Sequence, residues 1–299
     1  METPPRPSST SSLLKDIETA VSPSSYSALR LWRPAAQRNL RNQWSKLATL
    51  RRSWDTTSAS GRIHAVALVN AFLSQKYLYF MDFGVLDDIP MIREKAKDKL
   101  LKELENCQTK LMSSYKDLVA VVVQIIEVSN SMKCYLKETN SPSLVTFENT
   151  IKSKNDDGDG RGIPVYALLS ISGHEGLAKE LVEMFVSELN LKRLIVVELL
   201  SMCSKVVKNN EIIWAKELYD GEFRDLSVCS LFSEESQELR PPSLAGSNRG
   251  CNHLKFEEHS DRETLQVYLT SWLAEVNINH DRLDDVLTIV GEEINVCLL

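Results

Sequence analysis

The sequence lacks the motifs on which most enzymes build an active site. It has no Walker phosphate loop, no Gly-x-Ser-x-Gly nucleophile elbow and no His-Glu-x-x-His metal motif. Its five histidines are spread along the chain, and none lies at helical spacing from another histidine or from a cysteine on a predicted helix. We therefore expect a protein that is not an enzyme and that holds no cofactor.

The chain also lacks paired cysteines. Six are scattered without a Cys-x-x-Cys motif, which is typical of a reducing compartment: Cys107, Cys134, Cys203, Cys229, Cys251 and Cys297. Cys251, His253 and His259 lie near one another in sequence, but no second pair of ligands accompanies them. We therefore expect no zinc site.

Long apolar runs are absent as well. The longest, Leu118–Val128, has about eleven residues and is interrupted by Gln124, so it is too short to cross a bilayer. The N-terminus has no apolar stretch of the kind found in secretory signals. The net charge of −6 disfavours binding of the whole molecule to nucleic acid or to an anionic membrane. We expect a protein of the cytosol or nucleus with no membrane partner.

The sequence does contain one long, regular apolar stripe. Between about Asp88 and Lys137, apolar residues alternate at spacings of four and three, the a/d pattern of a coiled coil. The stripe comprises Leu100, Leu104, Cys107, Leu111, Ser114, Leu118, Val121, Ile125, Val128, Met132 and Tyr135, of which only Ser114 is polar. Such a helix is roughly 70 Å long. We expect other helices, of this chain or of a partner, to cover it.

Shorter helical patterns flank this stretch. Residues 34–54 and 61–80 are predicted to form two helices separated by a turn at 58–61. Their predicted buried faces are Leu40, Trp44, Leu47 and Trp54 in the first, and Ile63, Val66, Ala67, Asn70, Leu73, Tyr77 and Phe80 in the second. Capping boxes at Ser172–Glu175 and Ser260–Glu263 predict two further helices, and a last short helix includes Leu283.

These patterns predict an all-α fold. We expect an elongated helical bundle with a long coiled-coil helix and a C-terminal helical hairpin module. The predicted divisions are a disordered arm (1–33), a helical coiled-coil region (34–137), a linker (138–171) and a C-terminal helical module (172–299). Within that module, residues 201–259 resemble a partly disordered insertion, because their apolar residues follow no sustained period.

Two groups of charged residues allow more than one interpretation. Lys192 and Arg193 could lie on the solvent side of their helix, pair with Glu188 or other acids one turn away, or contact a partner. Arginines and tryptophans interleave in residues 30–54, which could grip nucleic acid, but a solvated helix with a tryptophan-rich buried face has the same pattern. We do not expect direct nucleic-acid binding, which would weaken steeply with added salt.

Two motifs resemble the cyclin-dependent kinase 2-interacting protein family. The first is Glu188-Leu-Asn-Leu-Lys-Arg193 followed by Glu198-Leu199, and the second is Tyr268-Leu-Thr-Ser-Trp272. The helix around Trp44 and the coiled coil lie in the same order as in that family, so the resemblance covers most of residues 40–290. After Trp272 the family tends to carry Gln-Pro-Tyr, which this chain lacks. The chain resembles a plant member with an insertion at 201–259.

The resemblance implies a non-catalytic nuclear adaptor or scaffold subunit, with the cytoplasm as a second location. The implied partners are a cyclin-dependent kinase, the replication-initiating kinase, a checkpoint kinase complex and AAA-type ATPases. They connect the family to the cell cycle, DNA replication, the DNA damage checkpoint and ribosome biogenesis at the large subunit. The expected partner-binding residues are Leu189, Leu191, Lys192, Arg193, Tyr268, Leu269 and Trp272.

Two alternatives stay open at this point. Most of those residues could instead be the core of the helical hairpin, with a coiled-coil partner helix completing the long seam. The rival function is a coiled-coil subunit of a cytoskeletal or vesicle-tethering complex, which a long helix in an acidic protein would suit equally.

Overall fold

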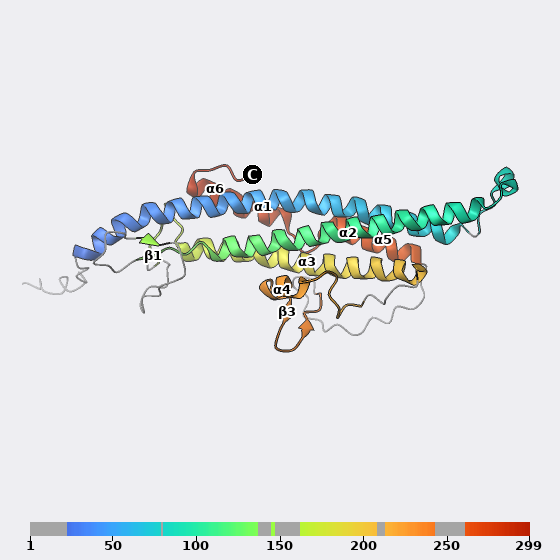
Figure 1. Ribbon diagram of the computed structural model, residues 1–299. Coiled ribbons are helices and arrows are strands. Elements are labelled where there is room, and N and C mark those ends of the chain that lie inside the picture. Colours follow the sequence, from blue (N-terminus) through green and yellow to red (C-terminus); the bar gives the residue numbers. More distant parts are fainter. Residues whose placement is uncertain (1–22, 79, 137–144, 147–161, 208–212, 243–260) are drawn as a thin grey trace, which may run out of the picture.

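The chain forms an elongated bundle of helices in the computed structural model (Figure 1). The structure describes residues 23–78, 80–136, 145–146, 162–207, 213–242 and 261–299. These residues form six α-helices, a short 3-10 helix and two small two-stranded hairpins. The predicted all-α fold, an elongated bundle with a long coiled-coil helix, is therefore confirmed.

The first helix is continuous where the sequence predicted two. α1 runs from Pro23 to Tyr77, so it includes residues 23–33 of the expected disordered arm, and residues 1–22 lie outside the described residues. The predicted turn at 58–61 is wrong. The buried positions follow spacings of four and three residues through that point, except that the half-buried Arg51 occupies the position between Leu47 and Trp54: Leu40, Trp44, Leu47, Trp54, Ser58, Gly61, Ala65, Leu68 and Phe72. A heptad seam with small residues in its middle thus runs through the whole helix.

The second half of α1 is buried on a different face from the predicted one. Ala65, Leu68 and Phe72 are buried, whereas Ile63 and Tyr77 are 63% and 44% exposed. The prediction chose the face with Ile63, Val66 and Tyr77, while the structure packs the opposite face, where Gly61 and Ala65 allow helices to approach closely.

The predicted coiled-coil helix is α2, Ile92–Asn130, which is shorter than expected at both ends. It follows the 3-10 helix η1, Gly84–Asp88, and packs mainly against α1 and then against α3. Its heptad positions from Leu104 to Ile125 are buried, including the polar Ser114. Most of the stripe is therefore covered by helices of this same chain.

The third long helix, α3, spans Ile171–Val207. Its first turn is capped by Ser170, whose hydroxyl accepts a hydrogen bond from Gly173 N at 3.2 Å, two residues before the start of the predicted capping box. The described end of the linker, residues 162–170, lies against α1, where Val165 is buried and its carbonyl accepts a bond from Gln37. The strands β1 (Tyr135–Leu136) and β2 (Val145–Thr146) form an antiparallel pair.

Part of the expected disordered insertion is folded. Residues 213–242 contain α4 (Glu222–Val228) and the antiparallel strands β3 (Phe232–Ser233) and β4 (Glu238–Leu239). α4 packs against α2, and Leu226 is buried there. Residues 208–212 and 243–260, including Cys251, His253 and His259, lie outside the described residues.

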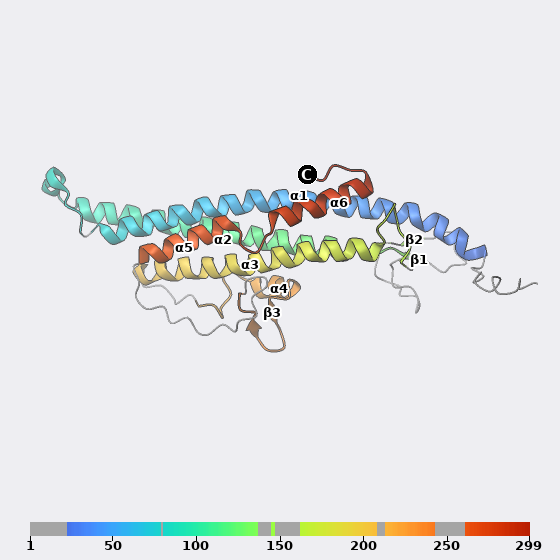
Figure 2. The same cartoon turned by 180° about the vertical axis from the view of Figure 1, so that it is seen from behind.

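The C-terminal helices are α5 (Asp261–Ala274) and α6 (His280–Ile294), which follow one another along the bundle and do not fold back side by side as a hairpin. Both helices lie along α1 and α3 (Figure 2). The predicted last helix is α6, whose apolar stripe is buried from Leu283 to Ile294, and the Asn279 side chain caps the helix by accepting from Arg282 N. The contact of α5 with α3 brings the second sequence motif onto the first.

Candidate partner-binding module

The seven predicted partner-binding residues come from α3 and α5, which contact each other. Four of them are buried: Leu189, Lys192, Arg193 and Trp272. The other three are half-buried: Leu191, Tyr268 and Leu269. The buried four have the packing role that was the alternative interpretation, while contact with a partner stays a prediction for the half-buried three.

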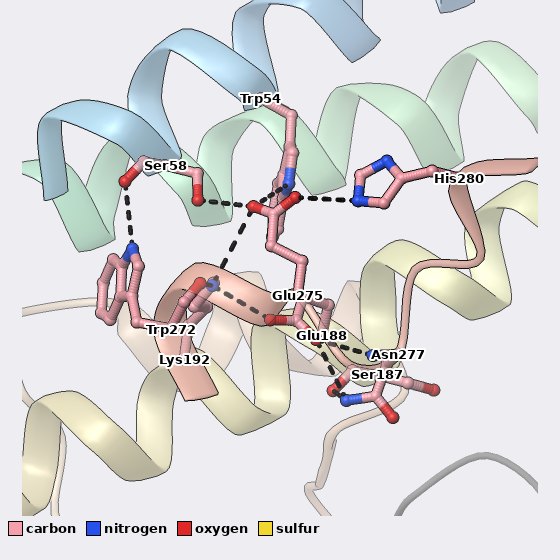
Figure 3. A network of polar contacts seen from close by, with 9 residues as sticks. All are labelled: Trp54, Ser58, Ser187, Glu188, Lys192, Trp272, Glu275, Asn277 and His280. Atoms are coloured by element: carbon pink, nitrogen blue, oxygen red, sulfur yellow. Dashed lines mark hydrogen bonds and ion pairs between the residues drawn. The ribbon is translucent and has the colours of Figure 1, made fainter. Parts of the chain in front are cut away.

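Lys192 lies at the centre of a buried polar network (Figure 3). Its ammonium nitrogen is 3.0 Å from Glu188 Oε1, one turn earlier on α3, and it donates to the carbonyl oxygen of Trp272. It also lies 4.8 Å from the centroid of the Trp272 indole, within cation–π distance. Because the last carbonyls of a helix lack partners within the helix, Lys192 satisfies one of them and ties the end of α5 to α3.

Glu188 binds the chain just after α5. Its Oε2 accepts from the backbone nitrogen of Asn277 at 3.0 Å and from the side-chain amide at 3.2 Å. The same amide donates to the carbonyl of Ser187 at 3.4 Å. These bonds hold the turn between α5 and α6 on the surface of α3.

Glu275 connects the module to α1. Its Oε1 accepts from the Ser58 hydroxyl at 2.6 Å and from the Trp54 indole nitrogen at 3.2 Å. The same oxygen lies 3.9 Å from Lys192 Nζ, and Oε2 lies 3.6 Å from His280 Nε2. Glu275 has a φ of 44°, a left-handed conformation that costs about 1–3 kcal/mol for a residue other than glycine. The network offsets this cost.

Burial controls the charges of Lys192 and Glu188. Both side chains are fully buried. Burial lowers the pKa of Lys192 and raises the pKa of Glu188, and in each case the opposite charge of the partner counteracts the shift. Each group therefore depends on the other, and removal of one leaves an uncompensated charge in the interior.

Arg193 forms a second buried ion pair, directed at α4. Its Nε lies 2.7 Å from Glu222 Oε1, and it donates to the carbonyls of Trp214 at 2.9 Å and Lys216 at 2.8 Å. Glu222 also accepts from the hydroxyl of Tyr115 on α2 at 2.6 Å. Arg193 thereby joins α4, and the loop before it, to α3 and α2.

The structure decides between the interpretations of Lys192 and Arg193. The solvent-side interpretation is wrong for both, since they are 0% and 1% exposed. Pairing of Lys192 with Glu188 is confirmed. Sequence reasoning missed Glu222 and Glu275, because nothing in the local pattern links them to positions so distant along the chain. Only the Glu188–Lys192 pair has a local signal, its i,i+4 spacing.

Apolar side chains remain open to solvent on the outside of α5 and its following turn. We call Leu269, Leu273 and Val276 the α5 surface. Leu273 and Val276 are 60% and 49% exposed, and Leu269 is half-buried. Leu273 directly follows the buried Trp272. The polar network of Lys192, Glu188 and Glu275, which holds α5 in place, therefore also determines the position of the α5 surface.

The tryptophans of α1 do not join its basic residues in a nucleic-acid site. Trp32, Trp44 and Trp54 are buried, and the Trp44 indole donates to His174 Nδ1 at 3.1 Å. None of these three rings can stack on a base, which single-strand binders require. Arg51 is paired with Asp284 of α6 at 3.1 Å.

Other kinds of site find no support in the part of the chain that the structure describes. Within these residues, no group of three or more His, Cys, Asp and Glu side chains could hold a metal ion. No helix in the same ranges has both the length and the apolar character to span a membrane. Among the described cysteines, those at 107, 203, 229 and 297 are free thiols.

The two sequence motifs that carry the family resemblance meet in the folded chain, because Lys192 of the first contacts Trp272 of the second. No family model and no curated protein matches this chain. The resemblance to the cyclin-dependent kinase 2-interacting protein family therefore stays a prediction based on those motifs.

Proposed function

We propose that this chain is a non-catalytic adaptor or scaffold subunit of the nucleus, with the cytoplasm as a second location. It links cell-cycle kinases, AAA-type ATPases, or both, to DNA replication, checkpoint signalling and maturation of the large ribosomal subunit. The observation that carries this proposal is the interlocking of the two motifs, through Lys192 and Trp272, beneath the α5 surface.

In this proposal the buried and exposed residues have different roles. Lys192, Glu188 and Glu275 hold α5 and the following turn against α1 and α3. The α5 surface makes the contact, since exposed apolar side chains in a cluster mark protein–protein sites. A rigid support of this kind reduces the conformational entropy that binding would otherwise cost.

The test is affinity purification from nuclei with the full chain and the double variant Leu273→Glu, Val276→Glu. Both positions are about half exposed, so the variant is expected to keep its circular dichroism spectrum and melting temperature. We expect it to lose cell-cycle kinases or AAA-type ATPases that the unchanged chain recovers. The control is Ile289→Glu on α6, which places one negative charge at an exposed apolar residue elsewhere and should leave recovery unchanged.

The same experiment separates the rival function. A coiled-coil subunit of a cytoskeletal or tethering complex is favoured by the length of α1, 55 residues in one helix. Recovery of tubulin or tethering subunits, without kinases or ATPases, supports that rival. Recovery of kinases or ATPases that is insensitive to Leu273→Glu, Val276→Glu contradicts the role of the α5 surface.

A further inference from the structure

The end of the α1–α2 hairpin carries the largest group of exposed apolar side chains in the described residues. It projects past the ends of α3 and α5 in both views (Figures 1 and 2). Nine large apolar residues between 63 and 91 are more than a third exposed: Ile63, Val66, Tyr77, Phe80, Met81, Val85, Leu86, Ile89 and Met91. Phe80 and Val85 are 83% and 86% exposed. We call residues 77–91 the tip.

The hairpin end exposes a substantial apolar area. Summed over all nine residues it is on the order of 1,000 Å², distributed over the tip region and one face of α1, and the largest single patch on a typical monomer is about 300–600 Å². A standard protein interface covers about 800 Å² on each partner. The hairpin end is therefore large enough to form one side of a stable interface.

The last part of α1 has apolar residues on two faces. One face, with Ala65, Leu68 and Phe72, packs inside the bundle. Ile63, Val66 and Tyr77 lie on another face at helical spacing and remain exposed. A helix that is apolar on more than one side is expected to have more than one neighbour, and a stripe with this period fits a second helix.

Charge is distributed unevenly along this hairpin end. The tip contains three aspartates, at 82, 87 and 88, and no lysine or arginine. The neighbouring part of α2, residues 92–102, has five basic residues against two acidic ones, although one of the five, Arg93, turns back to the tip and donates to the Met81 carbonyl at 3.1 Å. In α1, residues 56–77 have two basic residues and no acidic one. An acidic apolar tip thus adjoins a basic shaft, which we define as residues 56–76 of α1 and 92–102 of α2.

We propose that two copies of this chain associate through their hairpin ends in an antiparallel overlap. The tip of each copy lies on the shaft of the other, so Asp82 and Asp88 of one copy face Lys95 and Lys99 of the second. These four side chains are exposed, and the two lysines are one helical turn apart. Phe80 and Val85 then cover the exposed stripe of α1 that contains Ile63 and Val66.

This arrangement has two-fold symmetry, so the contact between the tip of one copy and the shaft of the other occurs twice. A parallel overlap instead sets the acidic tips against each other and the basic shafts against each other, which like charges disfavour. The charge pattern therefore selects the antiparallel geometry, and the apolar residues provide most of the affinity.

The first test is the molar mass of the full chain by light scattering and sedimentation. We expect a dimer at micromolar concentration, and a dissociation constant at least tenfold higher for Phe80→Asp, Val85→Asp. Both residues are more than 80% exposed, so this variant should keep its fold. The control Ile289→Asp, at an exposed position of α6, should leave the dimer unchanged. A full chain that is monomeric at about 100 µM, far above micromolar dissociation constants, overturns the proposal.

The second test uses charge reversal. Asp82→Lys, Asp88→Lys and, separately, Lys95→Glu, Lys99→Glu should each produce monomers, because tip and shaft then repel in both halves of the dimer. An equimolar mixture of the two variants should form a heterodimer, since every tip again meets a shaft of opposite charge. Failure of the mixture to associate, while each variant is folded, contradicts the antiparallel geometry.

Two other occupants of the tip would be recognised in the same experiments. If the chain stays monomeric but sediments with phosphatidylcholine vesicles, and Phe80→Asp, Val85→Asp abolishes this, the tip is a membrane contact and the proposal is wrong. If the monomer instead forms a stoichiometric complex with a purified kinase or ATPase that the same variant prevents, the tip belongs to that partner and self-association is likewise ruled out.

Discussion

The indole of Trp272 lies against Gly61 so closely that a β-carbon at residue 61 would stand 2.6 Å from Trp272 Cζ2. The Trp272 indole nitrogen donates to the carbonyl of Ser58 at 3.0 Å, one turn earlier on α1. The missing side chain of Gly61 therefore makes room for the second sequence motif on α1. This contact places α5, and with it the α5 surface.

Gly61→Ala should destabilise the protein, although alanine is normally the better helix former. Alanine in place of glycine contributes about 1 kcal/mol within a helix, whereas overpacking a core costs about 1–3 kcal/mol. Trp272 is 1% exposed and has no open space to move into, so we expect a net loss of about 1 kcal/mol in the free energy of unfolding. Urea denaturation measures it. Gly176→Ala on α3, where nothing lies within 4 Å of the added carbon, is the control and should be neutral or stabilising.

Lys192→Met should strongly destabilise the fold, because it leaves the Glu188 carboxylate buried without its cation. Breaking a buried ion pair at one partner costs about 3–5 kcal/mol. The double variant Lys192→Met, Glu188→Gln should recover part of this loss, since glutamine can still accept from Asn277. Chemical denaturation of the three proteins measures the coupling. Equal stability of Lys192→Met and of Lys192→Met, Glu188→Gln would show that Glu188 does not depend on Lys192. The control is Lys179→Met, at an exposed position of the same helix, which should leave the stability unchanged.

Glu222→Gln should loosen residues 213–242 from the bundle. The change leaves Arg193 buried without its carboxylate, at a cost of about 3 kcal/mol or more. Because the three long helices do not depend on this segment for their mutual packing, we expect local release with most of the helix content kept. Trypsin should then cut faster after Lys216 and Arg224. The control Glu234→Gln, at an exposed position after β3, should be cut by trypsin at the same rate as the unchanged chain. An unaltered rate for Glu222→Gln would contradict the role of Glu222 as an anchor of this segment.

Acid should destabilise the protein through His174. Burial lowers the pKa of this histidine to about 4, from a usual value near 6.5. Because the folded state then binds the proton less readily than the unfolded state, its stability is complete above about pH 6.5 and declines toward pH 4. Between pH 7 and pH 5 the expected loss is about 2 kcal/mol. Denaturation at both pH values should show this loss, and His174→Gln should reduce it; equal losses in both proteins would exclude His174 as the cause.

The helices with strict apolar spacing were predictable from the sequence. The a/d pattern of α2 and the short stripe of α6 are local properties, and the buried residues from Leu104 to Ile125 and from Leu283 to Ile294 agree with them. Helical periodicity depends only on neighbours within two or three turns. The four buried aromatic or aliphatic residues of the first predicted helix, Leu40, Trp44, Leu47 and Trp54, follow the same rule.

The heptad spacing that makes α1 one continuous helix is in the sequence, but it is difficult to recognise there. Its seam passes through Ser58, Gly61 and Ala65, which carry too little apolar surface to stand out beside Ile63 and Val66. Small residues become a buried face only when another helix approaches closely, as α5 does at Gly61. Which of two apolar faces packs inside is therefore a property of the neighbour.

The sequence by itself determined that the chain is helical, where most helices lie and which side of α2 is buried, because each of these follows from residues a few positions apart. Only the tertiary structure decided that Arg193 meets Glu222, 29 residues away, and that Glu275 meets Ser58, 217 residues away. A buried charge needs a partner, and which residue becomes that partner depends on how the helices pack. The local spacing of residues in the sequence does not predict such a pair.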